Sequence, residues 1–115
     1  MSAVVKDYRE LIAWQLADRF KTLVFELVRR SPGAERNQRY SGQLLDSAAA
    51  VSKDIVEGFK RFRPKVMMDF LDYALGSLHE AEERLRDGIE LRYFRADECA
   101  EALRYAKRCT VAQSG

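Results

Sequence analysis

Hydrophobic residues recur at three- and four-residue intervals along most of the chain, which is the spacing of one face of an α-helix. This pattern predicts four helices with approximate bounds 7–30, 41–59, 64–91 and 97–112. Asp7 is a candidate N-cap of the first helix, and Ser31-Pro32-Gly33 is expected to end it. The first apolar stripe comprises Leu11, Ile12, Leu16, Phe20, Leu23, Val24, Leu27 and Val28. Residues 34–40 are polar, and we expect them to form a loop.

The other three predicted helices carry apolar stripes of the same kind. The second stripe comprises Leu44, Ala48, Val51, Ile55 and Phe59, and the third comprises Met67, Leu71, Ala74, Leu78, Ala81 and Leu85, in heptad spacing. The fourth, after an expected Asp97 cap, comprises Ala100, Leu103, Ala106 and Val111. No segment shows a sustained period of two, so no sheet is expected. The predicted fold is all-α, an up-and-down antiparallel four-helix bundle in one domain spanning residues 1–115.

Composition narrows the class of protein. The chain has 115 residues, of which 47% are hydrophobic and 33% charged, as in an ordinary soluble domain. No apolar run approaches the ~20 residues of a membrane span, and the first residues lack a signal-peptide pattern. We therefore expect a cytoplasmic protein with no membrane partner.

The net charge is only +2, so any nucleic-acid binding must come from local patches. The first and third connections of an up-and-down bundle share one end, and the candidate residues there are Arg29, Arg30, Arg36, Arg39, Arg92 and Arg95. The second connection places Lys60, Arg61, Arg63 and Lys65 at the opposite end. Phe59, Phe62 and Tyr93 lie among these cations and could stack on bases. The alternative is that these helix ends are simply solvated, with cations favouring helix C-termini.

The sequence lacks the combinations of residues that catalysis usually requires. His79 is the only histidine, and Gly76 stands where a di-iron Glu-x-x-His motif needs its glutamate. His79 and Glu83 share a helix face, which fits a solvated ion pair better than two metal ligands. There is no glycine-rich phosphate loop, and no nucleophile has a histidine partner. We expect no enzyme activity, no cofactor and no metal.

Two cysteines and two glycine motifs are interpreted as structural. Cys99 and Cys109 are ten residues apart in one predicted helix, a rise of ~15 Å that a disulfide cannot bridge, so we expect buried thiols. Gly58, after Glu57, suits a helix C-terminus in a left-handed conformation. Gly76 in a helix interior costs about 1 kcal/mol, which favours close approach of a neighbouring helix. Ser77 is then free to hydrogen-bond Glu57 or the backbone.

The middle of the chain carries a longer signature. It consists of Gln43-Leu44, Ala48, Val51, Asp54-Ile55-Val56-Glu57-Gly58-Phe59, Arg61, Phe70-Leu71, Ala74, Gly76-Ser77-Leu78, Glu80, Glu82 and Leu85. With these residues the chain resembles the four-helix bundle proteins encoded in 23S rRNA intervening sequences of bacteria. The resemblance implies a homo-oligomer, typically a pentameric ring, without known catalytic activity. It also implies kinship with the accessory variability determinant proteins of diversity-generating retroelements, which bind a reverse transcriptase and nucleic acid through a basic surface.

The chain departs from the family pattern at several positions. Leu45 and Asp46 replace two arginines, Leu75 replaces a third, and Asp54 replaces a frequent asparagine. The two leucines favour packing or subunit contact, which leaves nucleic-acid binding to the helix ends. The leading hypothesis is a non-enzymatic oligomer that binds RNA or DNA as an rRNA-associated or retroelement-accessory factor, with a reverse transcriptase as possible partner. The alternative is a protein–protein interaction scaffold that binds no nucleic acid.

Overall fold

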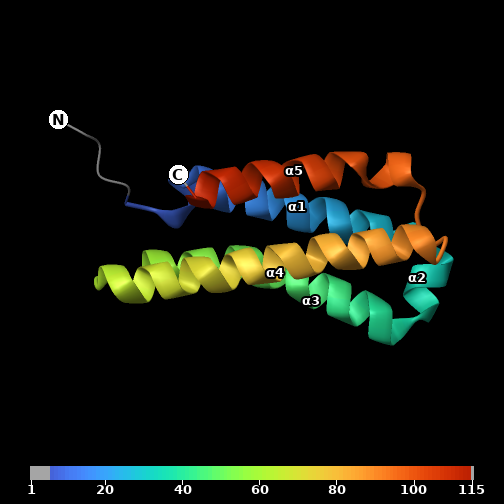
Figure 1. Ribbon diagram of the computed structural model, residues 1–115, viewed down its shortest axis with the longest axis horizontal. Coiled ribbons are helices and arrows are strands. Elements are labelled where there is room, and N and C mark those ends of the chain that lie inside the picture. Colours follow the sequence, from blue (N-terminus) through green and yellow to red (C-terminus); the bar gives the residue numbers. More distant parts are fainter. Residues whose placement is uncertain (1–5, 115) are drawn as a thin grey trace.

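The computed structural model describes residues 6–114, which form five α-helices and one short 3-10 helix (Figure 1). The elements are η1 (Tyr8–Glu10), α1 (Ile12–Arg29), α2 (Pro32–Arg36), α3 (Gln38–Phe59), α4 (Pro64–Glu90) and α5 (Ala96–Ser114). Within this part of the chain no strand occurs. Four long helices run alternately in opposite directions, so the predicted all-α bundle is confirmed. Residues 1–5, which carry part of the expectation about a signal peptide, lie outside the described residues.

The bundle is elongated because its long helices run side by side along one direction, and one end projects because these helices differ in length. Its extents are 50 × 23 × 19 Å. The 27 residues of α4 span about 40 Å, whereas α1 and α5, with 18 and 19 residues, each span less than 30 Å. α3 packs along α4, and α1 lies against both α3 and α5. The turn between α3 and α4 therefore projects beyond the α1–α5 pair (Figure 1).

The core follows the predicted stripes in the first three long helices, except that Ile12 and Met67 are exposed, and it departs from the predicted stripe in part of α5. Phe20, Leu44 and Leu78 are among the fully buried side chains. In α5 the buried positions are Cys99, Ala102, Ala106 and Cys109. Val111 was assigned to the core and is 68% exposed, so that prediction was wrong. The burial of Cys99 and Cys109 confirms the expectation of buried thiols, and the small side chains of Cys and Ala allow α5 to lie close to α1.

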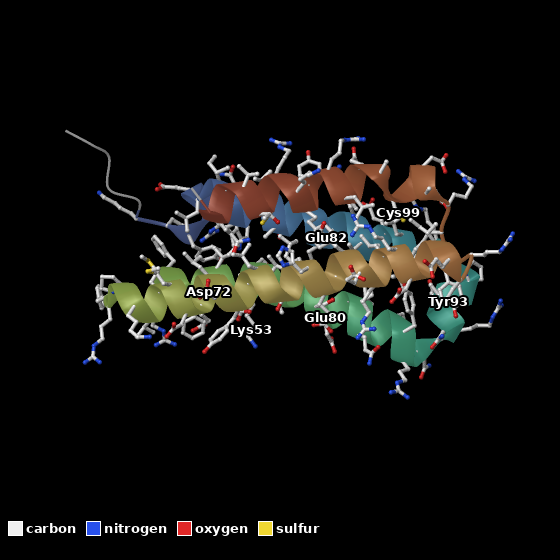
Figure 2. All side chains as sticks on the ribbon, in the orientation of Figure 1. Lys53, Asp72, Glu80, Glu82, Tyr93 and Cys99 are labelled. Atoms are coloured by element: carbon white, nitrogen blue, oxygen red, sulfur yellow. The ribbon has the colours of Figure 1, made fainter. Side chains whose placement is uncertain are left out.

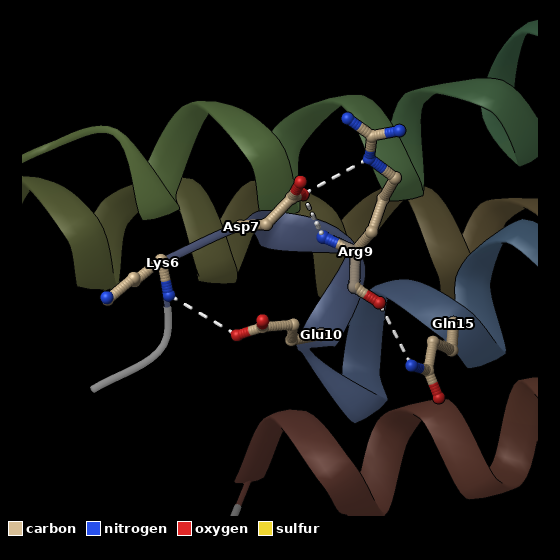
Figure 3. A network of polar contacts seen from close by, with 5 residues as sticks. All are labelled: Lys6, Asp7, Arg9, Glu10 and Gln15. Atoms are coloured by element: carbon tan, nitrogen blue, oxygen red, sulfur yellow. Dashed lines mark hydrogen bonds and ion pairs between the residues drawn. The ribbon is translucent and has the colours of Figure 1, made fainter. Parts of the chain in front are cut away.

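The first predicted helix is interrupted near its start. Asp7 does act as a cap, but of η1: its side chain accepts a hydrogen bond from the Arg9 backbone N–H at 2.9 Å (Figure 3). Leu11 is extended, with φ −72° and ψ 127°, and α1 begins only after it. Gln15 Nε2 then donates to the Arg9 carbonyl at 2.9 Å. Because the chain turns here, Ile12 becomes the first residue of α1, and its side chain is 63% exposed rather than buried.

The expected loop over residues 34–40 is largely helical. Ser31 caps α2 by accepting from the Ala34 N–H at 3.2 Å, and Pro32 occupies the first turn of that helix. Asn37 caps α3 by accepting from the Tyr40 N–H at 3.1 Å. Because of these two capping signals, the connection consists of the short helix α2 followed directly by the first turn of α3, rather than a loop.

The fourth long helix also starts differently from the expectation. α5 begins at Ala96, and the Glu98 carboxylate accepts from the Arg95 N–H at 2.9 Å. Asp97, expected as the cap, instead pairs with the Arg95 side chain. Glu98 can reach back three residues to the free backbone N–H, as in the second half of a capping box.

Candidate nucleic-acid interface

Six arginines gather at the end of the bundle where α2 lies. Arg29 and Arg30 close α1, Arg36 closes α2, and Arg39 lies in the first turn of α3. The connection between α4 and α5 reaches the same end (Figure 1) and adds Arg92 and Arg95. All six side chains belong to exposed residues. We call this set the arginine end; Figure 2 labels Tyr93, which lies in the connection between α4 and α5 at this end.

The arginine end is poorly neutralised by carboxylates. Arg95 Nε lies 3.0 Å from Asp97 Oδ1. This hydrogen bond holds the pKa of the Asp97 carboxyl below its usual value, although both side chains are exposed. Among residues 6–114, no ion pair involves the other five arginines. Their positive charge is therefore directed to solvent or to a ligand.

The helix dipole accounts for some of these arginines but not for all of them. Arg29 and Arg36 lie in the last turns of α1 and α2, where the partial negative charge of the helix favours a cation. Arg39 lies in the first turn of α3, where the dipole disfavours a cation. Helix-end electrostatics alone therefore does not explain the cluster.

Arg92 occupies an unusual backbone conformation. Its φ is 64°, the left-handed region that usually holds glycine at the end of a helix. The Tyr93 N–H donates to the Gly88 carbonyl at 2.9 Å and the Arg92 N–H donates to the Ile89 carbonyl at 3.1 Å. These two bonds form a Schellman motif, which ends α4. An arginine here costs stability that glycine would not.

The opposite end is the turn between α3 and α4, which we call the hairpin end: Lys60, Arg61, Arg63 and Lys65, with Phe62. Glu57 pairs with Lys60 at 3.9 Å and with Arg61 at 3.3 Å. Lys65 pairs with Asp69 at 3.7 Å, and the Arg61 guanidinium lies over the Phe70 ring. Only Arg63 of the four cations lacks an ion pair in the described chain. This end is therefore more nearly neutral than the arginine end.

Of the three aromatic residues expected to stack on bases, one is free to do so. Phe62 is fully exposed at the tip of the hairpin, beside a hollow of about 420 Å³. Tyr93 is held in place, because its hydroxyl accepts from Asn37 Nδ2 at 2.9 Å and its ring packs against Tyr40. Phe59 is only partly exposed and lines an apolar pocket. The expected stacking role is thus left to Phe62.

Residues that could carry other chemistry are dispersed. Within residues 6–114 no group of three or more His, Cys, Asp or Glu side chains is placed to hold a metal ion. His79 and Glu83 are both exposed, and the expected ion pair between them is not formed in this part of the chain. No described helix combines the length and the apolar character that crossing a membrane requires. Cys99 and Cys109 are free thiols and buried, and burial raises the pKa of Cys99 to about 11.

Comparison with known protein families shows to which family the chain belongs. The model of the 23S rRNA-intervening sequence protein family matches residues 9–112, nearly the whole chain. The chain belongs to this family. No curated protein is similar enough to match it.

The first glycine motif of this intervening-sequence protein, Glu57-Gly58, has a structural role, but Gly58 does not have the left-handed conformation that was expected. No glycine among the described residues has positive φ, so Gly58 does not adopt the left-handed conformation. Gly58 is buried, and a Cβ there would lie 3.2 Å from Phe70 Cβ and 3.3 Å from the Met67 carbonyl oxygen. Glycine suits this position because α4 approaches α3 closely here, and a Cβ would make tighter contacts than usual.

The second glycine motif, Gly76-Ser77, has no neighbouring helix packed closely against its glycine in the described structure. A Cβ on Gly76 would have nothing within 4 Å, so the expected close helix approach does not occur in the described structure. No hydrogen bond joins Ser77 to Glu57 among residues 6–114, because the neighbouring Gly58 faces Met67 and Phe70, and Ser77 lies well beyond these residues along α4. Leu45, one of the departures from the family pattern, packs against the core as expected.

A cluster of Tyr40, Gly88, Tyr93 and Phe94 supports the arginine end and was not predicted from the sequence. Gly88 is buried in α4 where a Cβ would overlap the Tyr40 hydroxyl and lie 2.6 Å from the Phe94 ring. The Tyr40 ring packs against Tyr93 and Phe94, which connect α4 to α5. A glycine followed by two aromatic residues near the predicted end of a helix was the available signal.

Proposed function

We propose that this protein is a non-enzymatic, oligomeric bundle that binds the phosphate backbone of RNA through its arginine end. The observation that carries the proposal is that five exposed arginines from separate connections lie at one end without a carboxylate partner among the described residues. Arginine binds phosphate oxygens through paired N–H donors, and such contacts dominate the affinity for nucleic acids.

The arginine end is a better candidate than the hairpin end. Three of the four hairpin cations already have a carboxylate within ion-pair distance. At the arginine end, only Arg95 does. Arg39 and Arg92 are also placed where a helix start and a left-handed backbone disfavour them. A binding function would explain why arginine stands at such positions.

The family relation supports RNA as the partner rather than a purely protein-binding scaffold. The family description refers to an intervening sequence of 23S rRNA, so a structured RNA is the first ligand to test. DNA, or a reverse transcriptase together with its nucleic acid, is the corresponding ligand for a retroelement-accessory role. Either role belongs in the cytoplasm.

Assembly as a homo-oligomer is part of the proposal. Met68 and Tyr73 on α4 are large side chains that are 61% and 59% exposed, which leaves them open to contact with a second copy. A ring such as the pentamer implied by the family resemblance would present several arginine ends to one RNA and raise its avidity. Light scattering measures this directly, and a monomer at all concentrations would contradict it.

Salt-dependent binding of a hairpin RNA tests the proposed interface. Each phosphate contact that is lost reduces the slope of log K against log salt by somewhat less than one. The variant Arg30→Gln/Arg36→Gln/Arg39→Gln should therefore bind more weakly, with the slope reduced by roughly two.

Two charge-matched variants serve as controls. Arg61→Gln/Arg63→Gln/Lys65→Gln removes three charges at the hairpin end, and Arg19→Gln/Arg104→Gln/Lys107→Gln removes three between the two ends. Both should change the slope less than the arginine-end variant does. Equal effects of all three variants would indicate attraction by net charge alone. No binding at low salt would favour the protein scaffold.

A further inference from the structure

A hollow of about 280 Å³ lies at the arginine end, where α1, α2 and α3 meet. Three helices supply its lining: Phe25, Val28 and Arg29 of α1, Glu35 of α2, and Ser41 and Leu45 of α3. Its volume is just below the roughly 300–1,000 Å³ of sites for drug-sized ligands, so it suits a group of the size of one nucleobase. Because Arg29 belongs to the arginine end, the hollow is part of the proposed RNA-binding surface.

The hollow contains two opposite charges that do not pair. Arg29 and Glu35 both line it and are both exposed, yet neither forms an ion pair among residues 6–114. A guanidinium binds anionic oxygens, and a carboxylate accepts hydrogen bonds from N–H donors. This arrangement fits a ligand with an anion on one side and N–H donors on another. A purely apolar occupant would use neither charge.

The rest of the lining is largely apolar and includes an aromatic ring. Phe25 is 37% exposed, which leaves part of its side chain open to a ligand. Phe25 and Arg29 are four residues apart in α1, so they are neighbours on one face of the helix. Aromatic side chains hold unpaired bases by stacking, and arginine binds phosphate. A single nucleotide can therefore contact both residues.

The carboxylate of Glu35 distinguishes among the bases. Only guanine presents two adjacent donors, N1–H and N2–H, on its Watson–Crick edge, and these match the two oxygens of a carboxylate. In a duplex this edge is already paired. We propose that the hollow binds one unpaired guanine, with its phosphate on Arg29, its base against Phe25 and its Watson–Crick edge on Glu35. The guanine site presupposes the proposed RNA binding and names the part of the RNA that the arginine end recognises.

A second copy of the chain is a less suitable occupant of this hollow. A two-fold contact at the arginine end would place its exposed arginines against the same arginines of the other copy. Five of them have no ion pair in the described chain, so their like charges would repel. RNA phosphates neutralise this charge instead, and the surroundings of the hollow therefore favour RNA.

Two short oligouridines, with either guanosine or inosine at the centre, test the proposal with the full-length protein. Inosine keeps the N1–H donor and lacks the 2-amino group. Fluorescence anisotropy of the end-labelled strands measures their affinities at one salt concentration. We expect the guanosine strand to bind about tenfold more tightly, the value of one hydrogen bond to a charged group. Annealing each strand to its complement should remove the difference, because the guanine edge is then paired.

Matched variants locate the preference. Glu35→Gln removes one acceptor oxygen and one negative charge, so it should abolish the preference for guanosine without weakening the inosine strand. Glu26→Gln, at an exposed position of α1 outside the hollow, removes the same charge and should keep the preference. Phe25→Leu should weaken both strands by about fivefold, because stacking is lost, with helix content checked by circular dichroism.

Three results would overturn the guanine site while leaving the proposed RNA binding intact. The first is equal affinity for the two strands. The second is a preference that Glu35→Gln leaves unchanged. The third is a preference that persists in the duplex. The absence of binding to any RNA at low salt would contradict both the guanine site and the proposed function.

Discussion

The hydroxyl of Tyr40 in α3 donates a hydrogen bond to the backbone carbonyl of Arg84 in α4. The Tyr40 ring also lies 5.1 Å from the Tyr93 ring, between centroids, and 6.5 Å from the Phe94 ring. One buried side chain thus joins the start of α3 to α4 and to the connection that leads to α5. The relative positions of Arg39 and Arg92 depend on these contacts of Tyr40.

Replacing Tyr40 with phenylalanine tests the importance of that hydrogen bond. We expect Tyr40→Phe to lower the free energy of unfolding by about 1 kcal/mol, because the aromatic packing is kept and one buried hydrogen bond is lost. Denaturant titration measures this. Tyr73→Phe is the control, since Tyr73 is 59% exposed and its substitution should leave stability nearly unchanged.

The same variant has a pH signature. Burial raises the pKa of Tyr40 above its usual value near 10. A phenol that stays protonated in the fold but ionises in the unfolded chain stabilises the fold fully below pH ~10, and this contribution falls as pH rises further. Tyr40→Phe should therefore lose less stability than the natural protein between neutral and strongly alkaline pH. An identical alkaline decline in both would show that Tyr40 does not control it.

Two glycines in the same helix should respond to alanine with opposite signs. A Cβ on Gly88 would lie 2.6 Å from the Phe94 ring, so Gly88→Ala should destabilise the fold by about 1–3 kcal/mol. A Cβ on Gly76 meets nothing within 4 Å, so Gly76→Ala should stabilise the chain by up to about 1 kcal/mol. Denaturant titration compares them. A destabilising Gly76→Ala, with a smaller mass by light scattering, would show that a second copy uses this space.

The sequence predicted the helices well wherever large apolar residues repeat. The stripes of α1, α3 and α4 carry enough Leu, Val and Ile for their period to be unmistakable. In α5 the burial of Cys99 and Cys109 was predicted correctly, but Val111 was wrongly added to the buried stripe, because an exposed valine gives the same hydrophobic signal as a buried one. Helix starts were less accurate, because a cap depends on one side chain, as at Ser31 and Asn37, rather than on a repeat.

The candidate site was predictable only in part. The topology of a four-helix bundle places the first and third connections together, so the arginine end follows from helix order alone. The ion pairing of the cations does not follow from helix order, because it depends on side-chain geometry, such as the position of Glu57 between Lys60 and Arg61. The hollow beside Phe25 was not predictable either, because Glu35 in its wall belongs to α2, a helix where the sequence indicated a loop.

The two cysteines should be unreactive in the folded protein. Burial, with a smaller contribution from the charge of Glu98, raises the pKa of Cys99 to about 11, and burial also raises the pKa of Cys109. Only the thiolate attacks thiol reagents, and it is scarce at pH 8. We expect both thiols to react with a chromogenic disulfide reagent in denaturant and neither to react quickly without it. Fast labelling of one thiol in the native protein would contradict its burial.

Arg92 allows the binding function to be separated from stability. Arg92→Gly should raise the free energy of unfolding by about 1 kcal/mol, because glycine adopts a φ of 64° without the steric cost that arginine has there. The same change should weaken RNA binding, because it removes one phosphate contact. Arg92→Ala is the matched control: it keeps the backbone cost and removes the charge, so it should weaken binding without stabilising the fold. If Arg92→Gly stabilises the protein and leaves the salt dependence of RNA binding unchanged, Arg92 takes no part in binding.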